Sequence, residues 1–234
     1  LDQNEIDLLT AVTDGTFKRV VVVFNTPSSF EATFLKDSAY AAFADKIDAA
    51  VWIGFTGSNG ITALGEILNG DVNPSGRLVD TYVHDNLSSA AMQNFGDYRY
   101  VNEDGSLSGY SYVNYAEGIY VGYKYYETRY EDAVMEQGNA SGNAGIFASK
   151  GDSWVYGEEV AYPFGYGMSY TTFEQALESV TYDAATDSFT VLVKVTNTGN
   201  VAGKEVVQVY GQQPYTEFDR ANAIEKASVQ LVGF

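Results

Sequence analysis

The chain has 234 residues, of which 45% are hydrophobic and 19% charged, a composition typical of a folded globular protein. Its formal net charge of −18, from 31 acidic and 13 basic residues, repels phosphate backbones, so nucleic acid is a poor partner. The absence of cysteine excludes disulfides, a cysteine nucleophile and cysteine zinc sites. No run of about 18 apolar residues occurs, so the sequence predicts no membrane span.

The first part of the chain alternates helical and strand patterns. Residues 4–12 place apolar side chains at helical spacing, and a second helix is expected over residues 38–46. Residues 20–24 and 49–54 are continuous apolar runs, which are typical of strands buried on both faces in a parallel sheet. A third helix ends near Leu68. This order of helix, strand, helix, strand and helix indicates an α/β architecture.

A turn follows at residues 71–78, with the sequence DVNPSGRL. Pro74 fixes its own φ and disfavours helix at the residue before it, while Gly76 is free to supply a positive φ. Arg77 is expected to anchor the turn to a carboxylate or to backbone carbonyls. The chain then enters a predicted strand over residues 78–83. We interpret this stretch as a rigid corner of the fold and not as a catalytic loop.

Residues 71–170 are rich in Gly, Asn, Ser, Asp and Tyr, and no long helical period is evident in them. Residues 94–110 and 137–151 have the composition of long loops or hairpin tips. The chain has 19 tyrosines and 13 phenylalanines, side chains that suit both sugar stacking and core packing. Core packing is the simpler explanation for most of them.

A different pattern begins near residue 172. Residues 188–196 alternate apolar and polar side chains, residues 197–200 are a turn, and residues 206–210 are a second strand. Two strands joined by a turn are typical of the beginning of a β-sandwich of the immunoglobulin or fibronectin III type. Such a domain has about 100 residues in antibodies, so we expect further polypeptide to complete it.

The sequence offers few types of side-chain arrangement that could act in catalysis. His84 is the one histidine, so a two-histidine metal site within this chain is excluded, and a Ser-His-Asp triad would need that residue. The glycine-rich residues 54–60 lack the lysine of a P-loop and the spacing of a dinucleotide loop. Glycoside hydrolysis needs two carboxylates. Glu117 stands out among tyrosines, although pairing with Lys124 or Arg129 explains it more simply.

Five stretches form a recognisable series in chain order. They are DVNPSGRL at 71–78, YAEGIYVGYKYY at 115–126, YPFGYGMSYTTF at 162–173, VTNTGNVAGKEVVQVY at 195–210 and LVGF at 231–234. Together they resemble the motifs of glycoside hydrolase family 3, which includes β-glucosidases and β-xylosidases. One departure is Val79, where the family usually has proline.

The resemblance implies a fold of two parts. Residues 1–171 would form a three-layer α/β sandwich with a mainly parallel sheet, and residues 172–234 an incomplete fibronectin III-like β-sandwich. In this family a separate (β/α)8 barrel normally supplies the nucleophilic Asp, and a loop resembling S-G-E-G-x-D-R supplies the acid/base Glu. Neither is matched by this sequence. We therefore assign no catalytic residue in this chain and expect both carboxylates to lie outside it.

The resemblance also implies which edge of the sheet faces the barrel. Asn25 and Thr26 follow one predicted strand, and Gly57, Ser58 and Asn59 follow the next. All five would lie at the carboxyl ends of parallel strands, where open α/β sheets bind ligands. We predict that they help to shape the rim of the substrate site.

A second candidate set for the rim is Phe95, Asp97 and Tyr98, in the tyrosine-rich loop. The simpler explanation for both sets is packing against the missing domain. Asp97 is also close enough in sequence to Arg99 to be paired with it.

The leading hypothesis is an accessory portion of a retaining, exo-acting β-glycosidase that hydrolyses terminal non-reducing β-linked sugars. It predicts no cofactor and no metal, and a β-linked oligosaccharide or glycoside as substrate. Its missing partners would be the barrel and the rest of the fibronectin III-like domain, and a homodimer is compatible with it. This portion alone is predicted to be inactive. The alternatives are a non-catalytic carbohydrate-binding or scaffold module, suggested by the tyrosine content, and a structural spacer.

Overall fold

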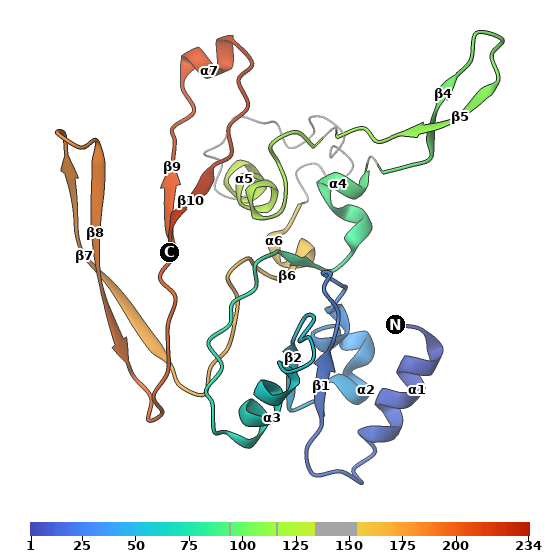
Figure 1. The fold of residues 1–234 in the computed structure, drawn as a ribbon, viewed down its shortest axis with the longest axis vertical. Coiled ribbons are helices and arrows are strands. Elements are labelled where there is room, and N and C mark those ends of the chain that lie inside the picture. Colours follow the sequence, from blue (N-terminus) through green and yellow to red (C-terminus); the bar gives the residue numbers. More distant parts are fainter. Residues whose placement is uncertain (94, 116, 134–153) are drawn as a thin grey trace.

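The computed structural model describes residues 1–93, 95–115, 117–133 and 154–234. A region of helices and short strands is followed by a region dominated by β-hairpins (Figure 1). Every sheet within the described residues is a pair of strands. The loop expected at residues 137–151 lies outside the described part of the chain.

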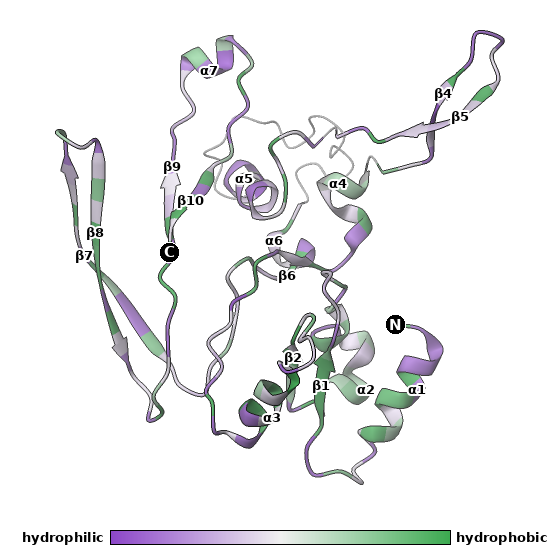
Figure 2. Ribbon diagram, viewed as in Figure 1, coloured by the Kyte–Doolittle hydropathy of each residue, from purple (hydrophilic) through white to green (hydrophobic). Residues whose placement is uncertain are grey.

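A parallel pair of strands lies at the centre of the first region. β1 (Val21–Phe24) pairs with β2 (Ala49–Trp52) in parallel, with Phe24 opposite Trp52. The helices α1 (Gln3–Val12) and α3 (Ile61–Asn69) flank this pair (Figure 1). Figure 2 shows that β1 is strongly hydrophobic. The expectation that it is buried on both faces was wrong for the described chain, since Val21 is 39% and Val23 is 37% exposed. The predicted α/β class and the parallel pairing of these two strands are confirmed, while a larger three-layer sandwich remains a prediction.

Local signals explain where the helices begin and end. α1 begins at a capping box, in which Asp2 Oδ1 accepts the N–H of Glu5 and Glu5 Oε2 accepts the N–H of Asp2, each at 2.8 Å. α3 ends at Gly70, whose φ of 84° is left-handed and therefore favours glycine. The helix expected over residues 38–46 is reduced to a 3₁₀ turn and the one-turn α2 (Ala41–Ala44).

One expectation for the middle of the chain was wrong. α5 (Tyr123–Ala133) is an 11-residue helix where no helical period was recognised, because tyrosines rather than aliphatic residues form much of its buried side. Of the two interpretations of residues 94–110, a loop or a hairpin tip, the structure shows the hairpin: β4 (Tyr98–Val101) pairs antiparallel with β5 (Leu107–Tyr112). Gly105, with a φ of 82°, lies in the turn that joins these strands.

The corner at residues 71–78 also differs from expectation. Gly76, which is free to adopt a positive φ, does not do so, and the left-handed residue that ends α3 is Gly70. The strand predicted over residues 78–83 is reduced to β3 (Tyr82–Val83). Leu78 instead donates its backbone N–H to the carbonyl of Tyr166 at 2.8 Å, which joins the corner to a distant loop.

A hydrophobic core forms where α5 packs against β3 and β6 (Val160–Tyr162). Tyr126 is 3% exposed and Trp154 is 4% exposed. Five buried residues make up this cluster: Val83, Tyr125, Tyr126, Trp154 and Val160. Core packing is therefore the role of several of the tyrosines that are abundant in the sequence.

The second region consists of two antiparallel hairpins. β7 (Phe173–Asp183) pairs with β8 (Ser188–Asn197), and β9 (Val209–Gln212) pairs with β10 (Val229–Gly233). The strand predicted over residues 188–196 is confirmed, but its partner β7 was not anticipated. The strand predicted over residues 206–210 begins at Val209 instead. A fibronectin III-like sandwich remains a prediction.

The remaining short elements complete the described fold. They are η1 (Thr33–Leu35), η2 (Ser38–Tyr40), η3 (Asn86–Ser88), α4 (Ala90–Gln93), α6 (Tyr156–Glu159) and α7 (Glu217–Ala221). Within the described residues, no helix combines the length and the apolar character needed to cross a bilayer.

The chain exposes an unusually large surface. Its accessible area is 15505 Å² for a mass of 25.5 kDa, whereas a compact monomer of that mass exposes about 10,000 Å². Apolar side chains alternate along the β7–β8 hairpin and the β4–β5 hairpin (Figure 2), and many of them are exposed. Surface of this kind is usually covered by another domain or chain.

Candidate functional site

The carboxyl ends of β1 and β2 bring the first predicted set of site residues together. Asn25 and Thr26 directly follow β1, and Gly57, Ser58 and Asn59 lie between β2 and α3. Because the two strands are parallel and in register, both loops leave the sheet at the same edge. Asn25 and the three β2-loop residues are exposed, and Thr26 is half-buried. The structure thus places all five at one accessible edge.

Trp52, the last residue of β2, joins the two loops. Its indole Nε1 donates a hydrogen bond to the carbonyl of Thr26 at 2.8 Å. Gly54 has a φ of 56°, and a Cβ at that position would lie 3.6 Å from the Trp52 ring. The backbone therefore passes close to the indole, which fixes the position of the β2 loop relative to the β1 loop.

A small hollow of about 120 Å³ lies beside these loops. It is smaller than the roughly 300–1,000 Å³ of a pocket for a drug-sized ligand, so it suits one polar group or a few waters. Its walls come from the end of β2, the segment after β1 and the stretch that follows the corner. The lining residues are Pro27, Ser29, Trp52, Leu78, Val79, Asp80 and Tyr82.

The hollow combines an aromatic wall with hydrogen-bonding groups. Burial, and secondarily the charge of Asp80, raises the pKa of the Tyr82 hydroxyl. Tyr82 is therefore protonated at neutral pH. Asp80 Oδ1 accepts the backbone N–H of Thr81 at 2.9 Å. A tyrosine and a carboxylate among the lining residues suit a neutral hydrogen-bonding group better than an anion.

Sequence reasoning missed Trp52, Asp80 and Tyr82. One signal could have found Trp52, since it is the last residue of the apolar run and therefore lies at the ligand-binding edge of a parallel sheet. Asp80 and Tyr82 carry no such local signal. They reach the hollow because the chain returns across this edge after the corner.

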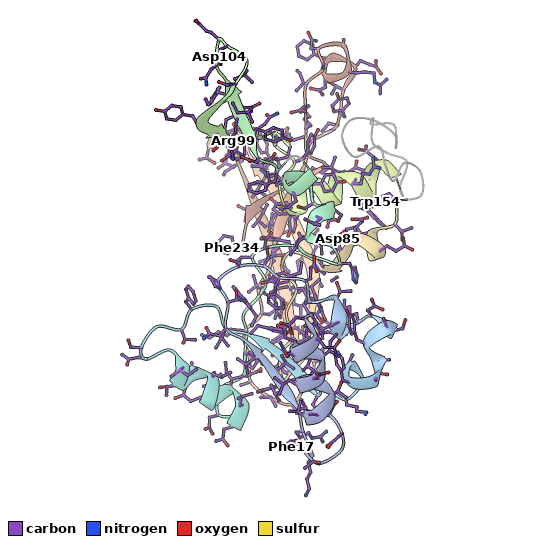
Figure 3. The ribbon with its side chains drawn as sticks, turned by 90° about the vertical axis from the view of Figure 1, so that its right-hand side faces the viewer. Phe17, Asp85, Arg99, Asp104, Trp154 and Phe234 are labelled. Atoms are coloured by element: carbon purple, nitrogen blue, oxygen red, sulfur yellow. The ribbon has the colours of Figure 1, made fainter. Side chains whose placement is uncertain are left out.

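The second predicted set lies elsewhere. Phe95, Asp97 and Tyr98 lie at the base of the β4–β5 hairpin, which projects away from the β1–β2 edge in both views (Figures 1 and 3). Asp97 Oδ2 and Arg99 Nη2 form an exposed ion pair at 2.9 Å, which confirms the expected pairing. The structure therefore does not bring the two candidate sets together.

Two other residues singled out in the sequence, Glu117 and His84, lie away from the β1–β2 loops in the chain. The Glu117 side chain is nearly buried, since the residue is 8% exposed. The His84 backbone joins two segments, since its N–H donates to the carbonyl of Glu159 and its carbonyl accepts the hydroxyl of Thr33, each at 2.9 Å. In the part of the chain that the structure describes, no three or more His, Asp or Glu side chains are grouped to hold a metal ion.

Comparison with known proteins defines the family. Residues 1–123 match the sequence profile described as the glycosyl hydrolase family 3 C-terminal domain. This match covers more than half of the chain, and the chain belongs to that family. The resemblance carried by its five sequence motifs is thereby confirmed.

Two of the similar curated proteins are β-glucosidases by name. The chain is 33% identical over 211 residues to β-glucosidase A of Butyrivibrio fibrisolvens, an alignment that covers 85% of this chain and 20% of that protein. It is 31% identical over 221 residues to a β-glucosidase of Ruminococcus albus, covering 94% of this chain and 18% of that one. The chain thus spans about a fifth of the length of these relatives.

Solved structures agree with this relationship. A β-glucosidase from Paenibacillus barengoltzii superposes with a TM-score of 0.72 at 29% identity, covering 99% of this chain and 20% of that one. β-Glucosidase 3B from Thermotoga neapolitana, solved in complex with α-D-glucose, gives a TM-score of 0.65 at 30% identity, covering 100% of this chain and 26% of that one.

Proposed function

We propose that this chain is the accessory portion of a retaining, exo-acting β-glycosidase of the β-glucosidase type. The whole enzyme would remove terminal non-reducing β-linked sugars from oligosaccharides or glycosides. The observation that carries the proposal is the family match over residues 1–123. Several of the similar proteins are β-glucosidases, which supports the sugar and the linkage.

The chain would have the two parts inferred from its motifs. Residues 1–171 form the α/β sandwich domain, supported by the parallel β1–β2 pair with its flanking helices. Residues 172–234 form part of a fibronectin III-like domain, supported by two antiparallel hairpins whose apolar side chains lack a facing sheet in the described residues. A facing sheet about 10 Å away would complete such a sandwich.

The reaction itself would take place on carboxylates outside this chain. In a retaining glycosidase, one carboxylate attacks the anomeric carbon while a carboxylic acid protonates the leaving oxygen. Water then hydrolyses the covalent glycosyl-enzyme, with the second carboxyl group acting as base. We assign neither role to a residue of this chain.

The contribution of this chain would be to shape and close the site from the β1–β2 edge. Asn25, Thr26, Gly57, Ser58 and Asn59 would form the rim, because they lie together at the carboxyl ends of parallel strands. Apolar side chains beside them are highly exposed, which supports contact between this edge and the catalytic barrel. These are Phe55 (77%), Ile61 (51%) and Val79 (76%).

The residues of the second candidate set are weaker candidates for the rim of the substrate site. Phe95, Asp97 and Tyr98 belong to a hairpin directed away from the β1–β2 edge (Figure 1). In the proposed enzyme they could reach a substrate only if the barrel or another chain extended to that hairpin. We therefore rank the first set above them as the rim.

Assays of the chain with and without a catalytic barrel test the proposal. Residues 1–234 alone should not release the chromophore from an aryl β-glucoside, and fusion to a family 3 barrel together with the loop that supplies the acid/base Glu should give turnover. Activity of residues 1–234 above a buffer blank would contradict the accessory role. Retardation of this chain on glucan-containing gels, with no activity in any fusion, would favour a carbohydrate-binding or scaffold module instead.

A further inference from the structure

The hollow beside the β1–β2 edge contains hydrogen-bonding atoms that no described residue satisfies. Tyr82 is 5% exposed, and its hydroxyl makes no hydrogen bond within the described residues. Asp80 uses Oδ1 to accept the N–H of Thr81 at 2.9 Å, and its Oδ2 accepts no hydrogen bond from the described chain. A buried polar group without a partner costs about 1–3 kcal/mol, so the tyrosine hydroxyl in particular points to an occupant of this hollow.

The backbone on both sides of Asp80 fixes the position of its carboxylate. Leu78 makes two backbone hydrogen bonds of 2.8 Å, to residues 165 and 166. Tyr82 pairs with Tyr162 across β3 and β6. The segment between them therefore presents Asp80 at a defined place on the wall of the hollow, and not on a free loop.

The size of the hollow restricts what can occupy it. Its volume is about 120 Å³, well below the roughly 300–1,000 Å³ of a pocket that encloses a whole drug-sized ligand. The hollow therefore receives one polar head group.

Charge selects among the possible head groups. The chain carries a net charge of −18, and any surface that covers this edge also takes the Asp80 carboxylate out of water, which is costly without an opposite charge. A neutral group would satisfy the hydrogen bonds but would leave that charge uncompensated. An ammonium or guanidinium group does both, because the carboxylate and the Tyr82 hydroxyl can each accept one of its N–H donors.

Exposed apolar side chains lie around the hollow. Val79 lines it and is 76% exposed, and Phe55, in the loop after β2, is 77% exposed. A charged anchor enclosed by contacts that exclude water is typical of the centre of a protein interface. The chain spans about a fifth of the length of its relatives, so the polypeptide of the proposed whole enzyme is long enough to supply that anchor.

We propose that the hollow is a socket for one lysine or arginine side chain of the catalytic barrel, and that its ion pair with Asp80 fastens the barrel to the β1–β2 edge. The hydroxyl of Tyr82 accepts a second N–H of the same head group. This inference rests on the accessory role proposed above and adds to it the contact that joins the two domains.

Thermal melting of the assembled enzyme tests the ion pair. Asp80→Asn should lower the melting temperature by at least about 3 °C, and because asparagine can still accept the N–H of Thr81, this loss reports the charge. Asp80→Lys should lower it further, since it brings like charges together. Asp45→Asn is the matched control, because it removes the same charge at an exposed position after α2 and should leave the melting temperature unchanged.

The outcomes separate this inference from the proposed function. An unchanged melting temperature in Asp80→Lys would overturn the socket, and a raised KM for oligosaccharides in that variant would reassign the hollow to the substrate. Failure of the unsubstituted enzyme to hydrolyse an aryl β-glucoside would count against the proposed function alone, because melting does not depend on turnover.

A photo-cross-link provides a second test if the Asp80 variants fail to fold. The photoreactive amino acid p-benzoylphenylalanine, introduced at Val79 in the assembled enzyme, should attach on irradiation to a barrel peptide that contains a lysine or arginine, identified by mass spectrometry. The same amino acid at Val180, which is 53% exposed on β7, should not capture that peptide. Attachment from position 79 only within residues 1–234, or to a barrel peptide without a basic residue, would overturn the proposal.

Discussion

Arg77 Nη2 donates a hydrogen bond to Glu205 Oε2 at 2.6 Å, which joins two residues 128 positions apart in the sequence. The two side chains are 14% and 15% exposed, so this ion pair is largely buried. It holds the corner at residues 71–78 against the segment before β9. The expectation that Arg77 anchors the corner to a carboxylate is thereby confirmed, and the corner is a junction between the two regions of the chain.

Glu205→Gln should destabilise the protein by about 1–3 kcal/mol, because the guanidinium of Arg77 would stay largely buried without its counter-charge. The measurement is the free energy of unfolding in urea. Asp97→Asn is the control, since the Asp97–Arg99 pair is exposed and should contribute less than about 1 kcal/mol. Equal losses of unfolding free energy in the two variants would show that the buried Arg77–Glu205 pair stabilises the protein no more than the exposed Asp97–Arg99 pair.

Asn73→Ala should also lower stability and should leave substrate affinity unchanged. The Asn73 side chain accepts hydrogen bonds from Ser169 Oγ (2.8 Å) and the Tyr170 N–H (2.7 Å), and donates to the carbonyl of Ala202 (2.9 Å). Losing these three hydrogen bonds, of which the one from Ser169 is partly buried, costs about 1–3 kcal/mol. The melting temperature and the KM of the proposed full enzyme should be measured together. An unchanged melting temperature with a raised KM would assign the corner to the substrate site instead.

Acid should destabilise the native chain partly through Asp219. Hydrogen bonds, first from Lys226 and then from Thr216, lower the pKa of this carboxyl from 3.8 to about 2. The unfolded state then binds more protons than the native state between these values, so this contribution to stability is complete above pH 3.8 and is lost as pH falls toward 2.

Thermal melts across this pH range check the effect in the variant Asp219→Asn. The variant should lose less stability than the parent protein as pH falls. Glu217→Gln, at an exposed position of the same helix, should follow the parent curve. Parallel curves for Asp219→Asn and the parent protein would remove Asp219 from the acid response.

Asn25→Ala and Asn59→Ala test the proposed rim in the assembled enzyme. Each should raise KM by about 2- to 12-fold, the equivalent of one hydrogen bond of 0.5–1.5 kcal/mol, with little change in melting temperature because both side chains are exposed. Asn102→Ala, at an exposed position directly after β4, is the control and should leave KM unchanged. If all three variants behave alike, the β1–β2 edge only packs against its neighbouring domain.

The sequence predicted the first region well because its signals are local. The apolar runs at residues 20–24 and 49–54 became the parallel strands β1 and β2, since short unbroken apolar runs bounded by turn residues favour strands. Polar loops after such strands indicated the candidate edge. Helix α5 escaped notice because its buried side is aromatic, and Tyr125 and Tyr126 were attributed to a loop-rich segment.

By itself, the sequence determined the family, the α/β class and the edge at which Asn25 and Asn59 lie. Motif order, strand patterning and turn residues are local properties, and each can be recognised without knowing which helices and strands pack together. Only the tertiary structure decided that Glu205 pairs with Arg77, that Trp52 joins the two loops, and that Tyr126 packs in one core with Val83 and Trp154. These relationships join residues far apart in the chain, and their energies depend on burial and distance, which exist only once the chain has folded.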